Sequence, residues 1–249
     1  MLIKACLNGD RRSGEHPALP LSPAELAEDA RRVVDAGVGA LHVHPRRPDG
    51  SETLEAEAVG AAVSAVRAAC PGVPVGVSTG AWIEPDVERR LALIESWGSL
   101  PDGGHPDFAS VNLSEPGAPE VCAALFDAGI GVEAGLWSPE DAQRLLEIGI
   151  AERCTRLLIE LVRERTAEEA RETAREIEAL LDRAGVATPR LLHGEGSVCW
   201  AMLEYVLERG YDVRVGLEDT LTMSDSGLAR DNTQLASAAR DLTTQLGKP

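Results

Sequence analysis

Aromatic side chains are scarce in this chain. Its 249 residues include only two phenylalanines and two tyrosines, and aromatic residues make up 3% of the total. The core must therefore be built mainly from alanine, valine, leucine and isoleucine, and a hydrophobic fraction of 44% is sufficient for that. A chain of this length fits one large domain.

Positive charge is also scarce. The chain carries 24 lysines and arginines against 41 aspartates and glutamates, which gives a formal net charge of −17. The summed field of such a protein repels a phosphate backbone or an anionic membrane, so we expect neither nucleic acid nor a membrane as partner. A small anionic substrate would need a local positive group, either a metal ion or a few arginines.

Signals of several other protein classes are missing. The five cysteines are scattered and never in C-x-x-C spacing, which is typical of reduced thiols in a cytosolic protein. No apolar run approaches about 18 residues, and the N-terminus lacks the basic and long apolar regions of a signal peptide, so we expect a soluble, cytoplasmic protein. No G-x-G-x-x-G follows the first predicted strand, which weakens a dinucleotide-binding interpretation.

Strand-like and helix-like segments alternate eight times along the chain. The strands are predicted at 2–8, 39–44, 73–78, 108–114, 130–137, 155–161, 190–193 and 212–218. The helices are predicted from Ser22 to a stop at Gly37, at 54–69, at 84–97, at 117–128, from Ser138 onward, and at 167–184, 197–209 and 228–245. Two of these helices open on a capping box, with Ser22 and Glu25 in the first and Thr166 and Glu169 in the sixth.

The strands begin roughly every 30 residues, as β/α units do. Eight such units in one chain predict a single (β/α)₈ TIM barrel that spans residues 1–249. A doubly wound open sheet is the alternative, because periodicity alone does not show that the sheet closes.

Two histidines lie two residues apart in the second predicted strand. The period of two along a strand places His42 and His44 on the same face, where two imidazole nitrogens can converge on one metal ion. Two packed and hydrogen-bonded histidines are the alternative interpretation, so the motif alone does not decide.

Polar residues gather at the C-terminal ends of the predicted strands, which is where a barrel has its active site. Each one alone has an ordinary structural explanation, but buried polar groups cost free energy unless they are paired and would not collect at one end by chance. Besides the two histidines, they are Asn8, Ser78, Thr79, Asn112, Ser114, Glu115, Glu133, Glu160, His193, Glu195, Arg214, Glu218 and Asp219.

The eighth predicted strand supplies a third metal-ligand candidate. Its alternation puts Arg214, Gly216 and Glu218 on one face. Two neutral histidines and one carboxylate, with one coordination position left open, are the ligands of a catalytic Zn²⁺ site. Arg214 and Asp219 could form a plain strand-end salt bridge, but a carboxylate held by a guanidinium beside a metal is also a proton acceptor.

Taken together, these motifs resemble the β-keto acid cleavage enzyme family, which is also known through 3-keto-5-aminohexanoate cleavage enzyme. The likeness extends over nearly the whole chain. It rests on Asn8-Gly9, Pro20 to Leu26, Ala36-Gly37, His42-Val43-His44-Pro45-Arg46, Asp49-Gly50, Ser78-Thr79-Gly80 and Arg214-Val215-Gly216-Leu217-Glu218-Asp219.

The resemblance implies an enzyme with Zn²⁺, or another divalent metal, as cofactor. It would condense a β-keto acid with acetyl-CoA and release acetoacetate and a new acyl-CoA. By the same resemblance, the zinc ligands are His42, His44 and Glu218, the general base is Asp219 held by Arg214, and Ser78 contacts the substrate carboxylate. Our further candidates for substrate contacts are Thr79, Asn8, Asn112, Glu115, His193 and Arg46.

The chain also departs from the family pattern. Arg11 stands where better-known members carry a glutamate, so that Asp10, Glu133, Glu160 or Glu195 would have to take its role, and Glu195 is our third catalytic candidate. The chain is short for the family, and Trp137 and the loop from His193 to Gly196 indicate a divergent branch with its own substrate. For the CoA phosphates, the candidate cations are Arg11, Arg12, Arg46 and Arg47.

Three other functions remain open at this point. An amidohydrolase-like enzyme also uses H-x-H on a barrel strand, but it places the motif on the first strand and adds further histidines. A metal-dependent aldol-type lyase differs mainly in the step after enolate formation. A non-catalytic sensor of a keto acid or acyl-CoA would bind ligand without turnover. Barrels of this kind are commonly homo-oligomers, which is our expectation here.

Overall fold

The computed structural model describes the chain from residue 1 to residue 246, with side chains to residue 244. Its eight strands are parallel and close into one barrel in the order β1 to β8, with β8 paired to β1. The strands are β1 (Ile3–Cys6), β2 (Ala40–Val43), β3 (Val75–Ser78), β4 (Phe108–Asn112), β5 (Gly131–Leu136), β6 (Arg156–Leu161), β7 (Arg190–Gly194) and β8 (Asp212–Val215). The predicted TIM barrel is confirmed, and the open-sheet alternative is excluded by the β1–β8 pairing.

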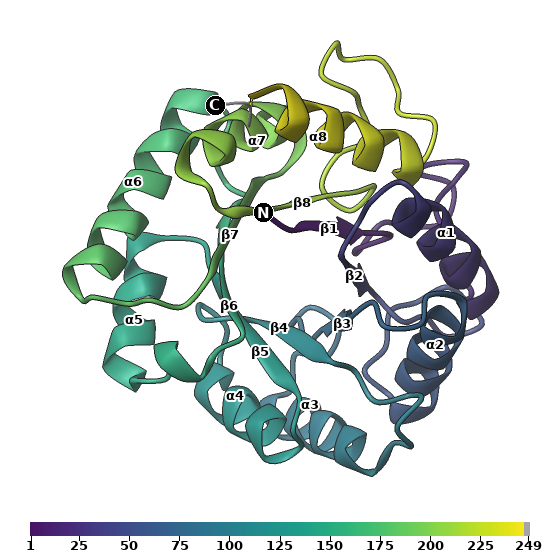
Figure 1. The fold of residues 1–249 in the computed structure, drawn as a ribbon. Coiled ribbons are helices and arrows are strands. Elements are labelled where there is room, and N and C mark those ends of the chain that lie inside the picture. The colour runs from purple at the N-terminus through teal and green to yellow at the C-terminus, as the bar shows by residue number, and fades with distance from the viewer. Residues whose placement is uncertain (247–249) are drawn as a thin grey trace.

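Each strand is followed by a helix, and Figure 1 shows the helices as an outer ring around the strands. They are α1 (Pro23–Asp35), α2 (Ala56–Ala69), α3 (Val87–Glu95), α4 (Ala118–Asp127), α5 (Pro139–Ile148), α6 (Ala167–Arg183), α7 (Cys199–Arg209) and α8 (Asn232–Leu246). Short 3₁₀ helices lie at Ser96–Ser99, Ala151–Arg153 and Gly196–Val198. None of the helices in residues 1–246 combines the length and apolar character that a membrane span needs.

The capping boxes begin their helices as expected. The Ser22 hydroxyl accepts a hydrogen bond from the Glu25 backbone N–H, and the Glu25 carboxylate accepts one from the Ser22 N–H, which fixes the start of α1. Thr166 and Glu169 form the same pair at the start of α6. Both capping boxes predicted from the sequence are confirmed.

The helices α3 and α8 begin three and four residues later than expected. The segment predicted as helix from residue 84 first forms a cap in which the Asp86 side chain accepts from the Arg89 N–H, so that α3 starts at Val87. The segment predicted from residue 228 pairs Leu228 with Thr222 in a short antiparallel bridge instead, and α8 starts at Asn232. In both places a local polar contact outweighs helical periodicity.

The apolar core lies between the strands and the helices. Valine, leucine, isoleucine and alanine from both layers form one continuous cluster there, with Trp97 as its largest fully buried side chain. All five cysteines are buried and unpaired. The barrel interior is different, because charged and polar side chains face into it from several strands, and this interior contains the candidate site.

Candidate metal centre and active site

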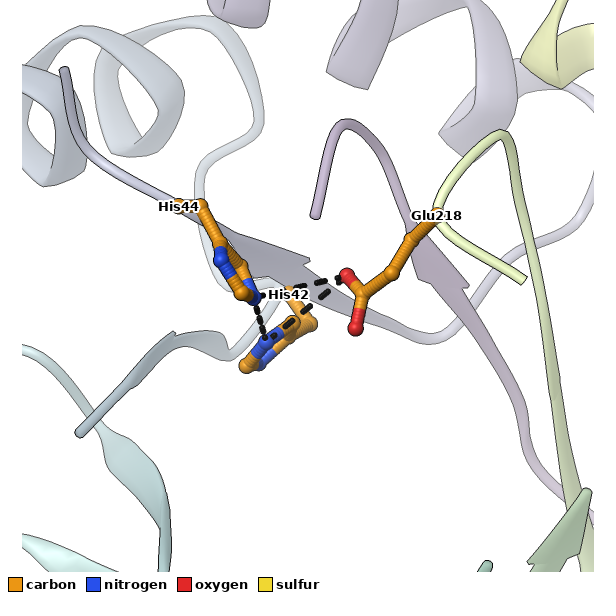
Figure 2. A group of neighbouring side chains, drawn as sticks. All are labelled: His42, His44 and Glu218. Carbon is orange, nitrogen blue, oxygen red and sulfur yellow. Dashed lines mark hydrogen bonds and ion pairs between the residues drawn. The ribbon is translucent and has the colours of Figure 1, made fainter. Parts of the chain in front are cut away.

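Three potential metal ligands converge at the C-terminal end of the barrel. His42 lies on β2, His44 directly follows β2, and Glu218 reaches toward both from the turn after β8 (Figure 2). The Nε2 atoms of the two histidines are 3.1 Å apart. The Oε2 atom of Glu218 is 3.8 Å from Nε2 of His42 and 3.7 Å from Nε2 of His44.

These separations fit a tetrahedral metal ion. Ligand bonds of 2.0–2.1 Å place the nitrogens and oxygens of a zinc site about 3.3 Å from one another. Oε2 of Glu218 is buried and has no hydrogen-bond donor among residues 1–244, which is the state expected of an atom that serves as a ligand. The three side chains can therefore hold one divalent ion and leave a fourth position toward the barrel cavity.

The two histidines differ in their surroundings. Burial, followed by the charge of His44, lowers the pKa of His42 well below its ordinary value, so its ring is neutral and able to ligate near neutral pH. Burial also lowers the pKa of His44, but the carboxylates of Glu218 and Glu52 outweigh it and the net shift is upward.

Glu218 lies in a backbone conformation that the sequence did not predict. The prediction of a strand over 212–218 is wrong, because β8 ends at Val215. A side chain at Gly216 would place its Cβ 1.9 Å from the carbonyl oxygen of Cys6, and the Gly216 carbonyl then accepts hydrogen bonds from the N–H groups of Asp219 and Thr220. Glu218 therefore lies in a turn and not on a strand face.

As a result of this turn, two consecutive carboxylates contact Arg214. Its Nε and Nη2 donate to Oδ1 of Asp219 at 3.0 and 2.6 Å, and Nη2 also donates to Oε1 of Glu218 at 2.7 Å. Burial alone would lower the pKa of Arg214, but the surrounding acids hold it well above its usual range. Arg214 thus remains a cation and holds Asp219 in one orientation, while Oδ2 of Asp219 has no hydrogen-bond partner within residues 1–244.

A second pair of side chains completes the polar cluster. His193 contacts Oε2 of Glu160 through Nε2 at 2.9 Å, and its Nδ1 lies 3.5 Å from Oδ1 of Asp219 without a hydrogen bond. Burial raises the pKa of Glu160, but the His193 contact and the charge of Arg214 outweigh it and bring the pKa to about 2. Glu160 is therefore an anion that orients His193 toward Asp219.

A cavity of about 340 Å³ opens above this cluster. Its wall contains a carboxyl group in an unusual state, because burial, and then the charge of Asp219, raise the pKa of Glu195 to about 8. Glu195 is therefore mostly protonated at neutral pH. The side chains that line the cavity are Asp10, His42, His44, Ser78, Trp82, Ser110, Asn112, Trp137, Glu160, Val162, Arg163, Glu195, Arg214 and Glu218.

The structure separates the candidate substrate contacts into two groups. Ser78 and Asn112 line the cavity, whereas the Thr79 hydroxyl donates to the Ser110 carbonyl at 2.7 Å. Glu115 accepts hydrogen bonds from Asn112 and from the Ala81 N–H.

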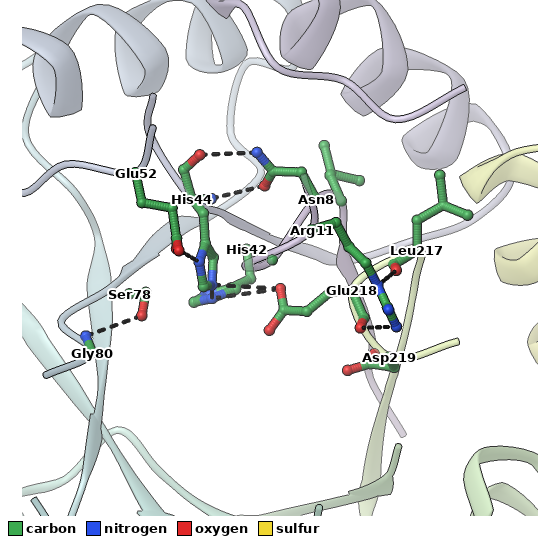
Figure 3. Close-up of polar contacts among 12 residues, drawn as sticks. Asn8, Arg11, His42, His44, Glu52, Ser78, Gly80, Leu217, Glu218 and Asp219 are labelled. Atoms are coloured by element: carbon green, nitrogen blue, oxygen red, sulfur yellow. Dashed lines mark hydrogen bonds and ion pairs between the residues drawn. The ribbon is translucent and has the colours of Figure 1, made fainter. Parts of the chain in front are cut away.

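Asn8 contacts the backbone next to the metal ligands. It exchanges two hydrogen bonds with the backbone of His44, at 2.9 and 2.8 Å (Figure 3). Thr79, Glu115 and Asn8 therefore hold neighbouring elements in place, and their side chains are outside the cavity wall.

Two of the four arginines expected to bind CoA phosphates donate to backbone carbonyls of the protein. Arg46 donates to the backbone carbonyls of Gly9, Arg11 and Gly50. Arg11 donates to the carbonyls of Leu217 and Glu218 (Figure 3).

The remaining two arginines of that set also lie outside the cavity wall. Arg47 pairs with Glu55, and Arg12 is an exposed side chain. Arg11 and Arg46 thus hold the loops around the candidate metal ligands in place. The arginines that line the cavity are Arg214 and Arg163, and the Arg163 guanidinium lies over the ring of Trp137.

The position expected for Glu133 is wrong. Glu133 is not at the C-terminal end of β5 but in the N-terminal half of the barrel, fully buried against Lys4 and Arg156. It therefore cannot replace the family glutamate whose position Arg11 occupies. Glu160 and Glu195 do line the cavity, as does Asp10.

Sequence reasoning also missed several residues of the site, among them Glu52 and Trp82. Glu52 accepts a hydrogen bond from Nδ1 of His44, and Trp82 lines the cavity next to it. Glu52 lies in a loop with no periodicity, so the sequence contains no signal for it. Trp82 could have been found, because it is one of few aromatic residues and lies two residues after Ser78-Thr79-Gly80.

The chain is similar to known proteins over its whole length. A family model described as beta-keto acid cleavage enzyme matches residues 1–249. A 3-keto-5-aminohexanoate cleavage enzyme of Fusobacterium nucleatum is 24% identical over 261 residues, which cover 100% of this chain and 93% of the relative. A 3-oxoadipate:acetyl-CoA acetyltransferase of Cupriavidus necator is 25% identical over 273 residues, which cover 100% of this chain and 90% of the relative.

A solved structure shares the fold. The binary complex of ObcA with oxaloacetate superposes with a TM-score of 0.73 at 19% identity, over 93% of this chain. The present chain spans only 64% of the length of that ObcA chain. The likeness therefore supports the barrel architecture.

Proposed function

The chain belongs to the beta-keto acid cleavage enzyme family and is an enzyme that acts on β-keto acids, and on that premise we propose a specific reaction. The enzyme uses Zn²⁺ to condense a β-keto acid with acetyl-CoA, and the products are acetoacetate and a new acyl-CoA. The name of the Cupriavidus necator relative, an acetyl-CoA acetyltransferase, supports acetyl-CoA as the second substrate. Two imidazoles and one carboxylate support zinc as the metal.

One observation carries the proposal. A carboxylate oxygen, Oδ2 of Asp219, is buried without a partner among residues 1–244, while its other oxygen is held by Arg214 within the same cluster as Glu218. A bound divalent ion supplies a Lewis acid that stabilises an oxyanion. A base with one free oxygen beside such a site is arranged to remove a proton from the carbon between the two carbonyl groups of a β-keto acid.

The chain's own residues have distinct roles in this reaction. Asp219 takes the α-proton, and Arg214 keeps its carboxylate aimed at the substrate. Ser78 and Asn112, from neighbouring strands, offer hydrogen bonds to the substrate carboxylate at the cavity wall. His193 lies next to Asp219 and can relay a proton to or from it.

The bonds balance without a further reactant. The α-carbon forms a bond to the acetyl carbon of acetyl-CoA, and the CoA thiolate leaves. That thiolate then attacks the original keto carbon, the bond between this carbon and the α-carbon breaks, and the α-carbon takes back a proton. The acetyl group therefore ends in acetoacetate, and the side-chain acyl group ends on CoA.

An isotope experiment tests which bonds form and which break in this reaction. The purified zinc-loaded protein is incubated with a panel of β-keto acids and acetyl-CoA that carries ¹³C in both acetyl carbons. We expect both labelled carbons in carbons 3 and 4 of acetoacetate and an unlabelled new acyl-CoA, with Asp219→Asn as the inactive control. Cleavage of the keto acid that does not require acetyl-CoA would instead establish an aldol-type lyase or a hydrolase.

A further inference from the structure

Glu52 lies behind one of the metal ligands, in the loop between β2 and α2. Its Oε1 atom is 2.6 Å from Nδ1 of His44, and its side chain is only 12% exposed. Figure 3 shows Glu52 on the opposite side of the His44 ring from Glu218. Glu52 therefore contacts the ligand from the side that faces away from the candidate ion site.

The loop holds Glu52 firmly in this place. Glu52 forms an antiparallel bridge with Arg46, and the Arg47 guanidinium donates to the Glu52 carbonyl at 3.1 Å. The Arg47 N–H also donates to the carbonyl of Ser51 at 2.8 Å, and Arg46 is bound to the loop after β1. Contacts with Arg46 and Arg47 thus fix the turn that carries the Glu52 carboxylate.

The contact determines which nitrogen of His44 is available. When Nδ1–H donates to a carboxylate, the proton is fixed there and the lone pair of Nε2 is left for a metal ion. Nε2 of His44 is the atom that faces Nε2 of His42 and Oε2 of Glu218. His42 has no such partner, because its Nδ1 is buried without a hydrogen bond within residues 1–244.

Trp82 adds a second contact to the same pair. Its Nε1–H donates to Oε2 of Glu52 at 3.1 Å, and its ring stacks on the His44 ring with centroids 6.2 Å apart and an interplanar angle of 22°. The indole is 48% exposed and forms part of the cavity wall. Both carboxylate oxygens of Glu52 therefore accept a hydrogen bond, Oε1 from His44 and Oε2 from Trp82 in the cavity wall.

We propose that Glu52 is a positioning residue of the metal centre, which fixes His44 as an Nε2 ligand, and that Trp82 connects this pair to the cavity wall. This inference rests on the proposed function, because it takes the ion to be held by His42, His44 and Glu218. Removal of such a partner typically weakens metal binding 10–100-fold.

Metal affinity, measured without substrates, tests the proposal. Zn²⁺ is titrated into metal-free wild type, Glu52→Ala, Glu52→Gln and Trp82→Phe in competition with a chromophoric chelator. We expect Glu52→Ala to bind Zn²⁺ about 10–100-fold more weakly, Glu52→Gln to fall between it and wild type, and Trp82→Phe, which keeps the stacked ring, to lose only a few-fold. Co²⁺ absorption spectra of the same proteins report any change in ligand geometry.

The control is a glutamate three residues further along. Glu55 pairs with Arg47 at the start of α2, and its side chain is 48% exposed. Glu55→Ala should bind Zn²⁺ as tightly as wild type, and thermal unfolding of all the metal-free variants shows whether the loop remains folded.

Three results would overturn the proposal, two of them from the variants. One is a Glu52→Ala protein that binds Zn²⁺ with wild-type affinity and an unchanged Co²⁺ spectrum. The other is an equal loss of affinity in Glu52→Ala and Glu55→Ala, which would show that only the loop fold matters. Wild-type protein that binds no ion would overturn both this inference and the zinc requirement, whereas tight, Glu52-dependent binding without acetoacetate formation would contradict only the reaction.

Discussion

The two ends of the barrel interior both contain buried charges, but they pair them differently. At the N-terminal end, Glu133 is bonded on both oxygens, to Lys4 and to Arg156, and Arg156 also contacts Asp212 at 3.3 Å. At the C-terminal end, one cation, Arg214, contacts three carboxylates.

Unpaired atoms also distinguish the two ends. Buried polar atoms without a hydrogen bond collect at the C-terminal end, and among residues 1–244 they include Nδ1 of His42, Nδ1 of His193, Oε2 of Glu218 and Oδ2 of Asp219.

The difference shows where the protein gives up stability for function. Paired buried charges offset much of each other's desolvation penalty, whereas a buried polar atom without a partner carries a penalty of about 1–3 kcal/mol. The N-terminal network leaves neither oxygen of Glu133 without a partner, and the unpaired atoms at the other end are those that a metal ion and a substrate would complete. Substitutions at the two ends should therefore change different properties.

Loss of both histidines should have the largest effect. In the His42→Ala/His44→Ala double variant we expect no stoichiometric metal and activity at the background level, because only Glu218 of the three ligands remains. Elemental analysis measures the metal. His105→Ala, which changes a histidine bonded to the carbonyls of Pro106 and Ala128, is the control and should keep its ion. Metal retained by the double variant would place the site elsewhere.

Asp219→Asn should reduce turnover without loss of stability. The amide can still accept the hydrogen bonds of Arg214 but cannot take a proton, so we expect kcat to fall by about 10²–10⁴-fold. The free energy of unfolding, from urea denaturation, should stay constant or rise, because a charge is removed from an acidic cluster. A variant with more than a tenth of wild-type kcat would contradict the assignment of the base.

Glu133→Gln should reduce the stability of the fold without a change in zinc affinity. Its loss leaves Lys4 buried without an anion, so we expect the free energy of unfolding to fall by about 3–5 kcal/mol, with zinc affinity unchanged. Urea denaturation at constant metal concentration measures the free energy of unfolding, and Zn²⁺ titration measures the affinity. The Lys4→Met/Glu133→Leu double variant should recover most of the loss, and a destabilisation below about 1 kcal/mol in the single variant would refute the role of the network.

The smallest expected effect is a pH dependence caused by Glu195. Its pKa is about 8 in the folded protein, against an ordinary value of 4.5, so between these values the folded state binds more protons than the unfolded state. Stability should therefore fall as the pH rises from about 4.5 to 8, and KM for an anionic keto acid should rise a few-fold above pH 8 as the cavity gains a negative charge.

Glu195→Gln separates this effect from general alkaline instability. It should flatten both profiles, whereas Glu204→Gln, at an exposed position on α7, should leave them as in wild type. Thermal unfolding and KM between pH 6 and 9 (roughly two units below and one unit above the shifted pKa) measure the two profiles. Identical slopes in wild type and Glu195→Gln would exclude Glu195 as their source.

Much of the fold could be predicted because local signals were sufficient. Hydrophobic periodicity located all eight units, and hydrogen-bonded capping boxes fixed the starts of α1 and α6. The pair His42 and His44 could be predicted for the same reason, since residues two apart along an extended segment share a face.

The features that could not be predicted depend on contacts between distant segments. The end of β8 at Val215 results from the close approach of Gly216 to Cys6, which lies at the other end of the chain. The depth of Glu133 in the barrel depends on its pairing with Lys4 across the interior. Glu52 belongs to a loop whose conformation is set by Arg46 and Arg47, and no periodic pattern marks it.

The candidate metal ligands lie where the barrel closes. His42 lies on β2, His44 directly follows it and Glu218 follows β8, and both strands pair with β1, which lies between them in the sheet. A bound ion therefore crosslinks an early and a late segment of the chain across the seam where the barrel closes, and an ion at 1,000 times its Kd adds about 4 kcal/mol to the folded state. A folding intermediate in which β8 has not yet docked has only two of the three ligands in place. The rate of metal uptake during refolding should therefore report the pairing of β8 with β1, which brings the two ends of the chain together.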